Sequence, residues 1–391
     1  MSEGVDQDPA AGAEPDHAGA PSPALAAHTT MRVGGVPTRF VTASTTDELV
    51  DAVRVVDDAD EPLGVLSGGS NLVIADEGVD ATVVHVATRG VEVESDDACS
   101  GVFVRVAAGE PWEDFVERAV DSGWAGIEAL AGIPGCVGST PIQNVGAYGQ
   151  EVSQTIARVR TWDRARGEVR TFANADCDFS YRHSRFKASP MPGRTAGDDV
   201  SSGLGGFSPR YVVLDVSFQF ERADLSRPIA YADLARGLDV DLGSRVPLAD
   251  AREAVLEQRR RRGMVLAADD HDTWSCGSFF TNPILTSGEF EHLTAQVERV
   301  VGEGVVPPGY PAEDGRVKTS AAWLIDKAGY GKGYGLPGPA ALSTKHVLAL
   351  TNRGDARAAD VVALAREIRD GVQERLGVRL VNEPVLVGLT L

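Results

Sequence analysis

The run FSYRHSRFK at positions 179–187 places cations among aromatic side chains in an otherwise acidic chain. Arg182 in this run carries a planar guanidinium, which can bind a carboxylate through two parallel hydrogen bonds, whereas a lysine cannot. A solvated basic loop would show the same spacing. The run therefore indicates either an arginine that recognises an anion or a charged surface loop.

A second stretch, SCGSFFTNP at positions 275–283, holds Ser278 between a glycine and two phenylalanines, ahead of an Asn-Pro turn. A serine in such a setting most often bonds to local backbone in a packed turn. The stretch lacks the G-x-S-x-G spacing of a hydrolase nucleophile, so hydrolase chemistry is not indicated.

A third candidate is Glu383, which lies in the run VNEPVLVG at positions 381–388. The proline that follows keeps Glu383 in extended conformation, and the apolar setting predicts a carboxyl pKa raised by desolvation. The alternative is a glutamate at a strand edge that faces water.

Two glycine-rich stretches predict places where the backbone passes close to a ligand. They are LSGGSN at 66–71 and GIEALAGIPGCVGSTPIQNVGAYG at 126–149. Residues without a Cβ let successive backbone N–H groups turn inward and bind an anion. We therefore expect a flat, phosphate-bearing cofactor at these loops, and tight turns without a ligand are the alternative.

Together these motifs resemble the UDP-N-acetylenolpyruvoylglucosamine reductase family, in the form that has a tyrosine loop. The resemblance runs from about His28 to the end of the chain, with the motifs in the family's order. It implies an α/β (α+β) fold, namely a vanillyl-alcohol-oxidase (PCMH)-type FAD-binding fold with an inserted α/β substrate-binding domain. The cofactor contacts that it implies are Ser67, Gly68, Gly69, Ser70, Asn71, Gly132, Ile133, Pro134, Gly135, Gly138, Gln143, Asn144, Gly146 and Ala147.

The resemblance also implies a reaction, the NADPH-dependent reduction of UDP-N-acetylglucosamine enolpyruvate to UDP-N-acetylmuramate, a peptidoglycan precursor. NADPH and the enolpyruvate would use one pocket in turn, with FAD as the redox cofactor. In this family pattern Arg182 and Glu383 stabilise the charge that develops on the substrate carboxylate, and Ser278 protonates the neighbouring carbon.

The same resemblance marks Tyr181, Tyr231, Arg262, Asn282 and Lys318 as substrate contacts. For each arginine or lysine a surface charge is the plainer alternative, and for Tyr231 it is a packed tyrosine at a helix start. The chain departs from the family pattern in having Arg262 where a lysine is expected, and in having an acidic tail and an insertion at 189–209.

The elements that must position these residues follow from patterns along the chain. A helix is expected after the capping residue Thr45, a β-hairpin at 156–163 and 168–172, and a long helix at 358–376. The organisation expected is a disordered acidic tail (1–26), a first FAD-binding subdomain (27–88), a second one (89–267, completed by 377–391) and a substrate-binding domain (268–376). The insertion at 189–209 is expected to be a mobile surface segment.

Composition narrows the function classes. The 391 residues are 43% apolar and 24% charged, which is typical of a globular chain of two or three domains. The net charge of −20 disfavours nucleic acid and anionic lipid as partners. The four cysteines form no C-x-x-C pair, so neither a disulfide framework nor a metal site is expected. No uncharged apolar run suggests export or a membrane span, and we expect a cytoplasmic monomer that acts on small molecules.

Two alternatives to the reductase remain open from the sequence. One is another flavin oxidase or dehydrogenase of the same FAD fold, which would not need cations for a diphosphate. The other is a nucleotide-sugar binding module without redox activity, which would purify without a yellow cofactor.

Overall fold

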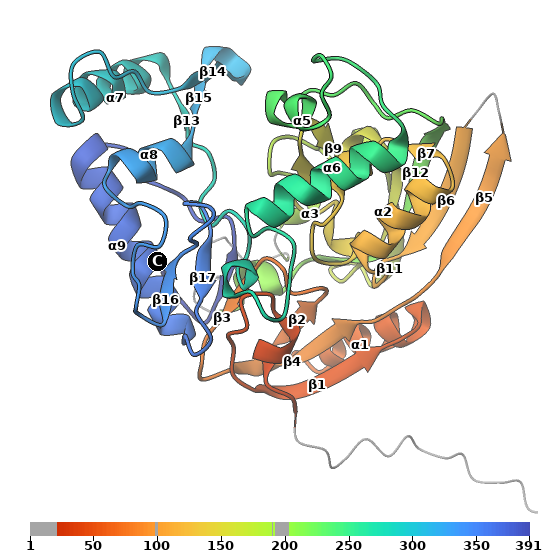
Figure 1. Ribbon diagram of the computed structural model, residues 1–391. Helices are drawn as coiled ribbons and strands as arrows, with labels where there is room; N and C mark the ends of the chain where they lie inside the picture. Colours follow the sequence, from red (N-terminus) through yellow and green to blue (C-terminus); the bar gives the residue numbers. More distant parts are fainter. Residues whose placement is uncertain (1–21, 98–100, 190, 192–202) are drawn as a thin grey trace, which may run out of the picture.

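The computed structural model describes residues 22–97, 101–189, 191 and 203–391, and these form three units (Figure 1). The first unit lies at the bottom of Figure 1, the second at the upper right and the third at the upper left. Because the three units are neighbours in space, residues that are far apart in the sequence come together between them.

The first unit is a small parallel sheet with one helix. Its strands pair in the order β1-β4-β2. Helix α1 begins with a complete capping box, in which the Thr45 side chain accepts from the Glu48 N–H and the Glu48 carboxylate accepts from the Thr45 N–H, as a Thr-x-x-Glu spacing predicts. The bounds are β1 (Pro37–Ala43), α1 (Thr46–Asp58), β2 (Leu63–Leu66), β3 (Leu72–Ile74) and β4 (Val79–Val86).

The second unit is built on an antiparallel sheet with the strand order β11-β10-β12-β6-β5, and β7 pairs with the end of β12. Helices α2 and α6 pack against each other on this unit (Figure 1). The bounds are β5 (Val91–Asp97), β6 (Gly101–Ala107), α2 (Trp112–Asp121), β7 (Trp124–Ala125), β8 (Gly146–Ala147), β9 (Gln150–Glu151), β10 (Ile156–Asp163), β11 (Glu168–Ala173), α3 (Arg185–Ala188), β12 (Tyr211–Arg222), α5 (Ala232–Gly237) and α6 (Leu248–Arg261).

The third unit packs helices against two small sheets. Strand β15 pairs with both β13 and β14, and β16 pairs with β17. Its longest helix, α9, ends where Gly377 takes a left-handed conformation with φ of 76°, a common helix stop. The bounds are β13 (Ile284–Leu285), α7 (Ser287–Val300), β14 (Gly309–Pro311), β15 (Val317–Thr319), α8 (Ala321–Lys327), β16 (Ala340–Leu342), β17 (Leu350–Asn352) and α9 (Ala358–Leu376), followed by β18 (Val385–Val387).

Apolar packing joins the units. One core contains Leu49 and Val84 of the first unit together with Trp112 and Phe218 of the second. Another joins Val73 of β3 to the helices of the third unit. The first unit is therefore packed against both of the other units.

The C-terminal strand is not where the sequence analysis expected it. Strand β18 pairs in parallel with β3 of the first unit, so the expectation that 377–391 completes the second unit is wrong. The pairing brings Val385 against Leu72 and Val387 against Ile74, and Val387 is fully buried there. A short apolar strand cannot reveal its partner from sequence, because either edge would bury it.

Two expectations about irregular segments need correction. Of the expected tail, residues 1–21 lie outside the described part, but Leu25 is fully buried and its N–H donates to the Gly35 carbonyl at 2.9 Å. Of the expected insertion, residues 190 and 192–202 lie outside the described part, whereas 203–209 are packed and Phe207 is 1% exposed. Phe207 lies against Gly64, where a Cβ would approach its ring to 2.3 Å.

Within the described ranges, none of the helices has the length and apolar character needed to cross a membrane. The same part of the chain contains no cluster of His, Cys, Asp or Glu side chains able to hold a metal ion.

Candidate active site

A cavity of about 470 Å³ lies where the units meet. The glycine-rich stretches form one side of it, and the segments at 263–266 and 273–278 form another, with Glu383 and Val385 contributed by the C-terminal strand region. Phe207 also lines it. A single chamber thus collects residues from all three expected chemical motifs.

The two glycine-rich loops pack backbone against backbone beside this cavity. A Cβ on Gly68 would lie 2.4 Å from the Gly135 Cα, a distance that no side chain tolerates. A Cβ on Gly69, whose φ is 60°, would lie still closer to its neighbour, 1.8 Å from the His28 carbonyl oxygen. These approaches explain why glycine recurs at both loops, since any larger residue would push them apart.

Most of the expected cofactor contacts line the cavity, and the others lie in the loops that form its wall without lining it. The buried side chain of Asn144 donates to Glu151 at 2.8 Å and to the Ser180 carbonyl at 3.3 Å, so it fixes the loop instead of facing the cavity. Those that line the cavity are Ser67, Gly69, Ser70, Asn71, Ile133, Pro134, Gln143, Gly146 and Ala147. Those behind the wall are Gly68, Gly132, Gly135, Gly138 and Asn144.

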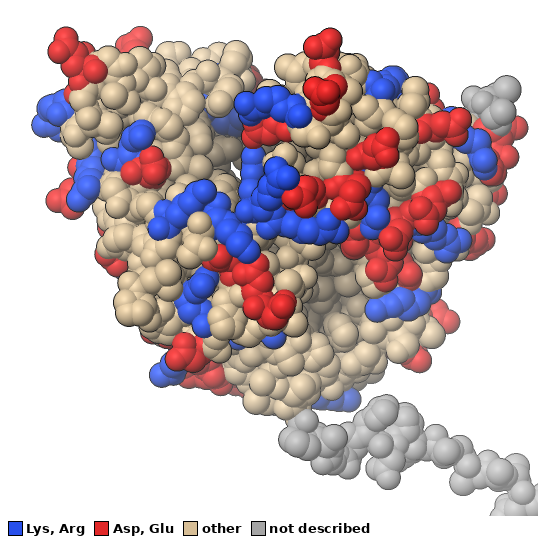
Figure 2. Space-filling model, in the orientation of Figure 1, with Lys and Arg blue, Asp and Glu red and all other residues tan. Residues whose placement is uncertain are grey.

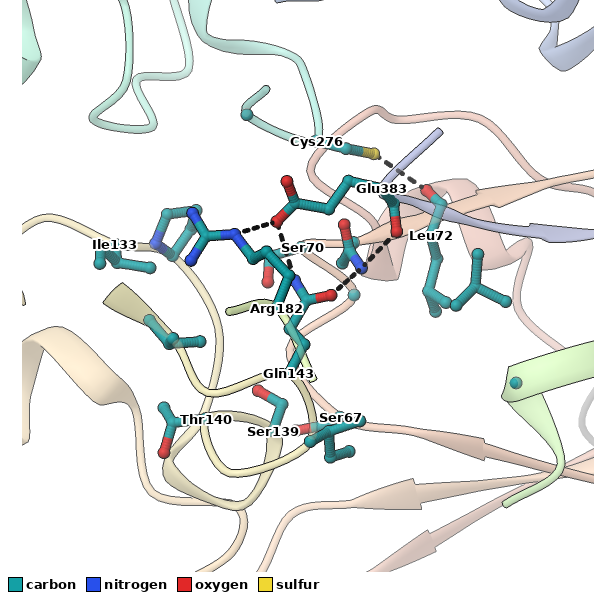
Figure 3. Close-up of a pocket in the computed structure, with 18 of the residues that line it drawn as sticks. Ser67, Ser70, Leu72, Ile133, Ser139, Thr140, Gln143, Arg182, Cys276 and Glu383 are labelled. Carbon is teal, nitrogen blue, oxygen red and sulfur yellow. Dashed lines mark hydrogen bonds and ion pairs between the residues drawn. The ribbon is translucent and has the colours of Figure 1, made fainter. Parts of the chain in front are cut away.

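Arg182 and Glu383 both line the cavity and contact each other there (Figure 3). The Arg182 Nε lies 2.8 Å from the Glu383 Oε1, and Gln143 donates to the same oxygen at 3.2 Å. Arg182 takes a left-handed backbone conformation, with φ of 55°, in a tight turn between Ser180 and His183. The turn aims the guanidinium at Glu383 and also at the Gly146 carbonyl, 3.3 Å from Nη1.

Ser278 lines the same cavity and is joined to Glu383 through the backbone. The Glu383 N–H donates to the Phe279 carbonyl at 2.8 Å, and Phe280 forms a β-bridge with Asn382. The segment that contains Ser278 therefore pairs in antiparallel fashion with the segment that contains Glu383. The sequence motifs at 179–187, 275–283 and 381–388 therefore converge.

Burial controls the charge of this centre. Burial raises the pKa of Glu383 above its ordinary value, and the positive charges of Arg182 and Lys187 oppose that shift. Burial also lowers the pKa of Lys187, whose Nζ donates to the Arg182 carbonyl at 3.2 Å. A carboxyl group with a raised pKa can carry a proton at a higher pH than an ordinary glutamate.

A further arginine lies at the cavity wall. Arg259, near the end of α6, donates from Nη2 to the carbonyls of Gly132 at 3.3 Å and Met264 at 2.8 Å, while its buried Nε has no hydrogen-bond partner in the described part of the chain. Burial lowers its pKa to about 10, so it still carries its charge at neutral pH. A cavity with a backbone cradle, amide side chains and a cation fits a large cofactor that bears acceptor groups and an anion.

The expected substrate contacts fall into two groups, and none of them lines this cavity. In the first group, the Lys318 Nζ lies 4.9 Å from the centre of the Tyr181 ring. Burial raises the pKa of Tyr181, with hydrogen bonding to Asn282 among the smaller opposing effects. The Asn282 Oδ1 also accepts from the Ala321 N–H at 3.0 Å, at the start of α8.

In the second group, Arg262 at the end of α6 forms an ion pair with Asp233 at 2.9 Å. Tyr231, just before α5, is 51% exposed and lies edge-on to Tyr148 with ring centres 5.8 Å apart. Figure 2 shows Lys and Arg side chains gathered in the middle of this face of the molecule, beside the hollow between the two upper lobes.

His346 connects this second group to the third unit. Burial lowers its pKa to about 4, and the charges of Arg262 and Lys332 act in the same direction. The sequence analysis did not single out His346 as a site residue. It also missed Lys187, Arg259 and Phe207 as site residues, although Lys187 lies in the run 179–187 and Phe207 in the expected insertion at 189–209.

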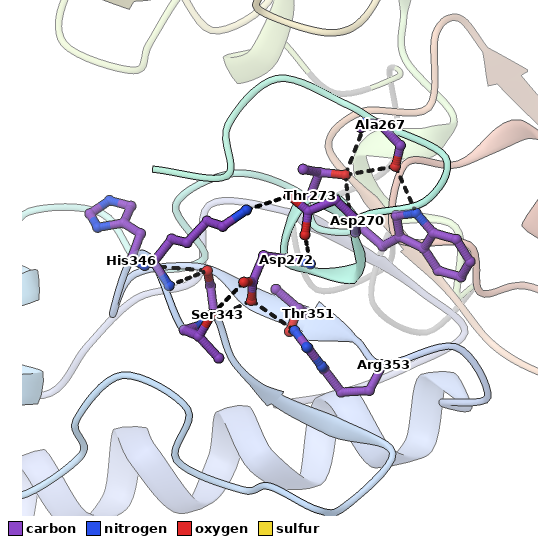
Figure 4. A network of polar contacts seen from close by, with 11 residues as sticks. Ala267, Asp270, Asp272, Thr273, Ser343, His346, Thr351 and Arg353 are labelled. Carbon is purple, nitrogen blue, oxygen red and sulfur yellow. Dashed lines mark hydrogen bonds and ion pairs between the residues drawn. The ribbon is translucent and has the colours of Figure 1, made fainter. Parts of the chain in front are cut away.

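A polar network fixes the segment that leads to Ser278 (Figure 4). Burial alone would raise the pKa of Asp272, but hydrogen bonds from Thr344 and Arg353 outweigh it and lower the pKa. The Arg353 Nη1 lies 2.8 Å from Asp272, and Lys345 pairs with Asp270. The network joins the loop before the serine motif to the sheet of β16 and β17.

Comparisons with known proteins agree with this geometry. Residues 269–387 match the family model described as UDP-N-acetylenolpyruvoylglucosamine reductase, C-terminal domain, and residues 37–173 match that of an FAD binding domain. The UDP-N-acetylenolpyruvoylglucosamine reductase of Streptomyces coelicolor is 56% identical over 368 residues, which cover 94% of this chain and 90% of the relative. That of Thermobifida fusca is 54% identical, covering 94% and 97%.

A solved structure shows the same arrangement. The crystal structure of UDP-N-acetylenolpyruvylglucosamine reductase from Thermus caldophilus aligns with a TM-score of 0.57 at 25% identity, covering 93% of this chain and 97% of that one. The expected fold class, a PCMH-type FAD-binding fold with an inserted α/β unit, is confirmed by these matches.

Proposed function

The chain belongs to the UDP-N-acetylenolpyruvoylglucosamine reductase family, and on that premise we propose that the cavity is its active site, with Arg182, Ser278 and Glu383 as the catalytic residues. The activity itself follows from family membership: it is the NADPH-dependent reduction of UDP-N-acetylglucosamine enolpyruvate to UDP-N-acetylmuramate, in peptidoglycan precursor synthesis, by an enzyme that contains FAD. The observation that carries the residue assignment is the 2.8 Å contact of Arg182 with Glu383 beside the serine motif.

The residues at the cavity fit FAD. We assign the two glycine-rich loops to its phosphates, because their backbones lie together at the cavity wall with Ser67, Ser70 and Ser139 beside them. Gln143 and Asn71, which bond to each other at 3.4 Å, hold the loops to Glu383. When bound, FAD supplies the transfer of a hydride from NADPH to the double bond of the substrate.

Arg182 and Glu383 would bind the substrate carboxylate. Reduction of the enolpyruvyl double bond builds negative charge on that carboxylate, and hydrogen bonds that strengthen as the charge develops lower the barrier. The guanidinium donates through its planar N–H groups, and Glu383 donates when it is protonated, which its raised pKa favours. Both donors are held in place by Gly146 and Gln143 before substrate arrives.

Ser278 would complete the reaction by giving the proton of its hydroxyl to the carbon next to the carboxylate. The product then has one new hydrogen on each carbon of the former double bond, and the serine recovers a proton from solvent. A hydroxyl is a weak acid, but an enolate carbon is a strong base, so transfer from a fixed serine is feasible. The bond from Glu383 N–H to the Phe279 carbonyl supports this placement.

We assign the uridine diphosphate to the cationic surface outside the cavity. Arg262 and Lys332, whose charges both lower the pKa of His346, supply positive charge there. Lys318 and Tyr181, which contact each other, form the other group of expected substrate contacts. Tyr231 is exposed at the end of the segment that precedes α5, so it can close over a bound nucleotide sugar. An arginine at 262 can bind a phosphate through two N–H groups once Asp233 releases it.

The test is anaerobic stopped-flow absorbance of the purified protein. NADPH should bleach the flavin, and UDP-N-acetylglucosamine enolpyruvate should then restore the oxidised spectrum. Reoxidation by dioxygen but not by the enolpyruvate would overturn the proposal in favour of an oxidase of the same fold. Failure to retain flavin after FAD is added would overturn both.

Three properties expected from the sequence are carried forward as proposals. We propose a monomer, a cytoplasmic location and the boundaries 27–88, 89–267 and 268–376 for the three units. Light scattering during size-exclusion chromatography, cell fractionation and limited proteolysis would check them in turn.

A further inference from the structure

Glu128 is a buried carboxylate that the reaction described above does not use. It is 1% exposed, and among the described residues no lysine or arginine side chain forms an ion pair with it. Instead three N–H donors converge on its two oxygens: the Gly126 amide at 2.6 Å, the Gln150 side chain at 2.9 Å and the Arg227 amide at 2.7 Å. Burying a charge is costly, and such a group persists only when hydrogen bonds satisfy it.

The three donors come from three different parts of the site. Gly126 begins the long glycine-rich stretch. Gln150 belongs to the hairpin of β8 and β9, which supplies the Gly146 carbonyl bound by Arg182. Arg227 begins the segment 227–231, which ends at Tyr231. One side chain therefore holds the cofactor loop, the hairpin behind Arg182 and the base of the tyrosine segment.

The hairpin and the tyrosine segment also touch at their far ends. The rings of Tyr148 and Tyr231 meet edge-on, and a Cβ on Gly149 would lie 2.7 Å from the Ala230 Cβ. Between these contacts and Glu128 lies a second cavity of about 310 Å³, lined by residues of both segments. The middle of the tyrosine segment is held from its other side, where Ile229 is buried and exchanges backbone hydrogen bonds with Ser244 at 2.9 Å and Gly243 at 2.8 Å. On the side of the hairpin, the segment is held by the Arg227 amide at one end and by Ala230 and Tyr231 at the other.

We propose that Glu128 is a positioning residue for the reduction, which sets the segment 227–231 against the hairpin of β8 and β9 so that Tyr231 stands at the substrate. The proposal rests on the proposed role of Tyr231 and deepens it. Glu128 acts through the Arg227 amide and touches neither substrate nor cofactor. Its contribution is to the binding of the UDP-linked substrate, because the segment that it anchors carries no group of the catalytic trio.

The test is a double-mutant cycle in the FAD-loaded enzyme, with KM and kcat measured for UDP-N-acetylglucosamine enolpyruvate. The Arg227 and Gln150 donors share the Oε1 oxygen, whereas the Gly126 amide binds Oε2, so a glutamine could keep the Arg227 bond. Glu128→Leu has a similar size but no acceptor, so the Arg227 amide loses its partner. We expect KM to rise about tenfold with kcat little changed. Tyr231→Ala should raise KM too, and adding Glu128→Leu to it should raise KM no further.

A role in fold stability alone would give a different result. It would lower the thermal midpoint and make the two substitutions act independently on KM, which would overturn the proposal, as would an unchanged KM in either single variant. A wild-type holoenzyme that does not reduce this substrate would overturn the proposed function itself, before any variant is compared.

A second variant keeps the proposal testable if Glu128→Leu does not fold. Arg227→Pro removes the amide that the tyrosine segment donates to Glu128, together with the Arg227 side chain and its ion pair with Glu221. Residue 227 already precedes a proline, which favours extended backbone. It should raise KM in the same way. Glu221→Gln is the matched control, because Glu221 pairs with the Arg227 side chain at 2.9 Å and is half exposed. That change should leave KM and kcat as they are.

Discussion

At the scale of single residues, Ser278 is the most direct test of the chemistry. Ser278→Ala removes a hydroxyl that lines the cavity next to the residue bonded to Glu383. We expect the enolpyruvate to reoxidise the flavin at least about 10²-fold more slowly, the usual effect of losing a general acid, while reduction by NADPH stays near normal. Stopped-flow measurement of both half-reactions checks this. Equal slowing of the two would show that Ser278 acts on binding or cofactor position instead.

Glu383 gives the reaction a dependence on pH with a defined sign. Burial raises its pKa, so the proton that it donates is present at low pH and is lost as pH rises through the raised value. Reoxidation by the enolpyruvate should therefore slow toward high pH in the wild type. Glu383→Gln keeps an N–H donor that does not titrate, so its profile should be flat in that range.

Glu383→Ala is the companion variant, because it removes the donor and leaves Arg182 without its partner at 2.8 Å. Its activity should fall well below that of Glu383→Gln, by about tenfold or more for the loss of a charge-assisted hydrogen bond. If the two variants are equally inactive at every pH, Glu383 is not a hydrogen-bond donor.

At the scale of elements, the contact of the two glycine-rich loops predicts a defect in cofactor binding. A methyl group on Gly68 would meet Gly135 at 2.4 Å, so Gly68→Ala must separate the loops. We expect weaker FAD binding and a loss of about 1–3 kcal/mol in stability, the typical cost of overpacking. Titration of the apoprotein with FAD and thermal unfolding measure the two effects. Gly288→Ala in α7, where a Cβ meets nothing within 4 Å, should leave FAD binding unchanged and should not lower stability, because alanine favours a helix more than glycine does.

Elements with local signals were predictable from the sequence. Thr45 and Glu48 give a capping box, and the helix that they predict is α1. The expected hairpin is observed as β10 and β11, because its two strands are joined by a short turn and pair with each other. The catalytic candidates were found from their motifs, and the resemblance supplied their roles.

What escaped prediction is long-range packing. Nothing local in Gly-Gly-Phe at 205–207 shows that Phe207 lies against Gly64, and the partner of β18 depends on a sheet edge formed by residues 72–74. Glu128 was overlooked because its three donors come together only in the folded chain. Such residues need coordinates, since their neighbours are set by topology and not by spacing.

At the scale of the whole molecule, the active site belongs to no single unit. Glu383 bonds to Asn71, Gln143 and Arg182, which reach it from the first and second units, and to Phe279 of the third. A fragment that keeps one unit intact would therefore keep none of the chemistry. The two apolar cores that cross between units keep these residues in place relative to one another.

The pairing of β3 with β18 has a consequence for how the protein is made. Asn71 and Glu383 are 312 residues apart, so a ribosome completes the first unit long before the strand that pairs with it exists. Until then the edge of β3 is free to pair with other chains, which is a known route to aggregation. Chaperones that shield nascent chains should matter most during this interval, and translation that stops before residue 387 should yield chains that can neither close the cavity nor stay soluble.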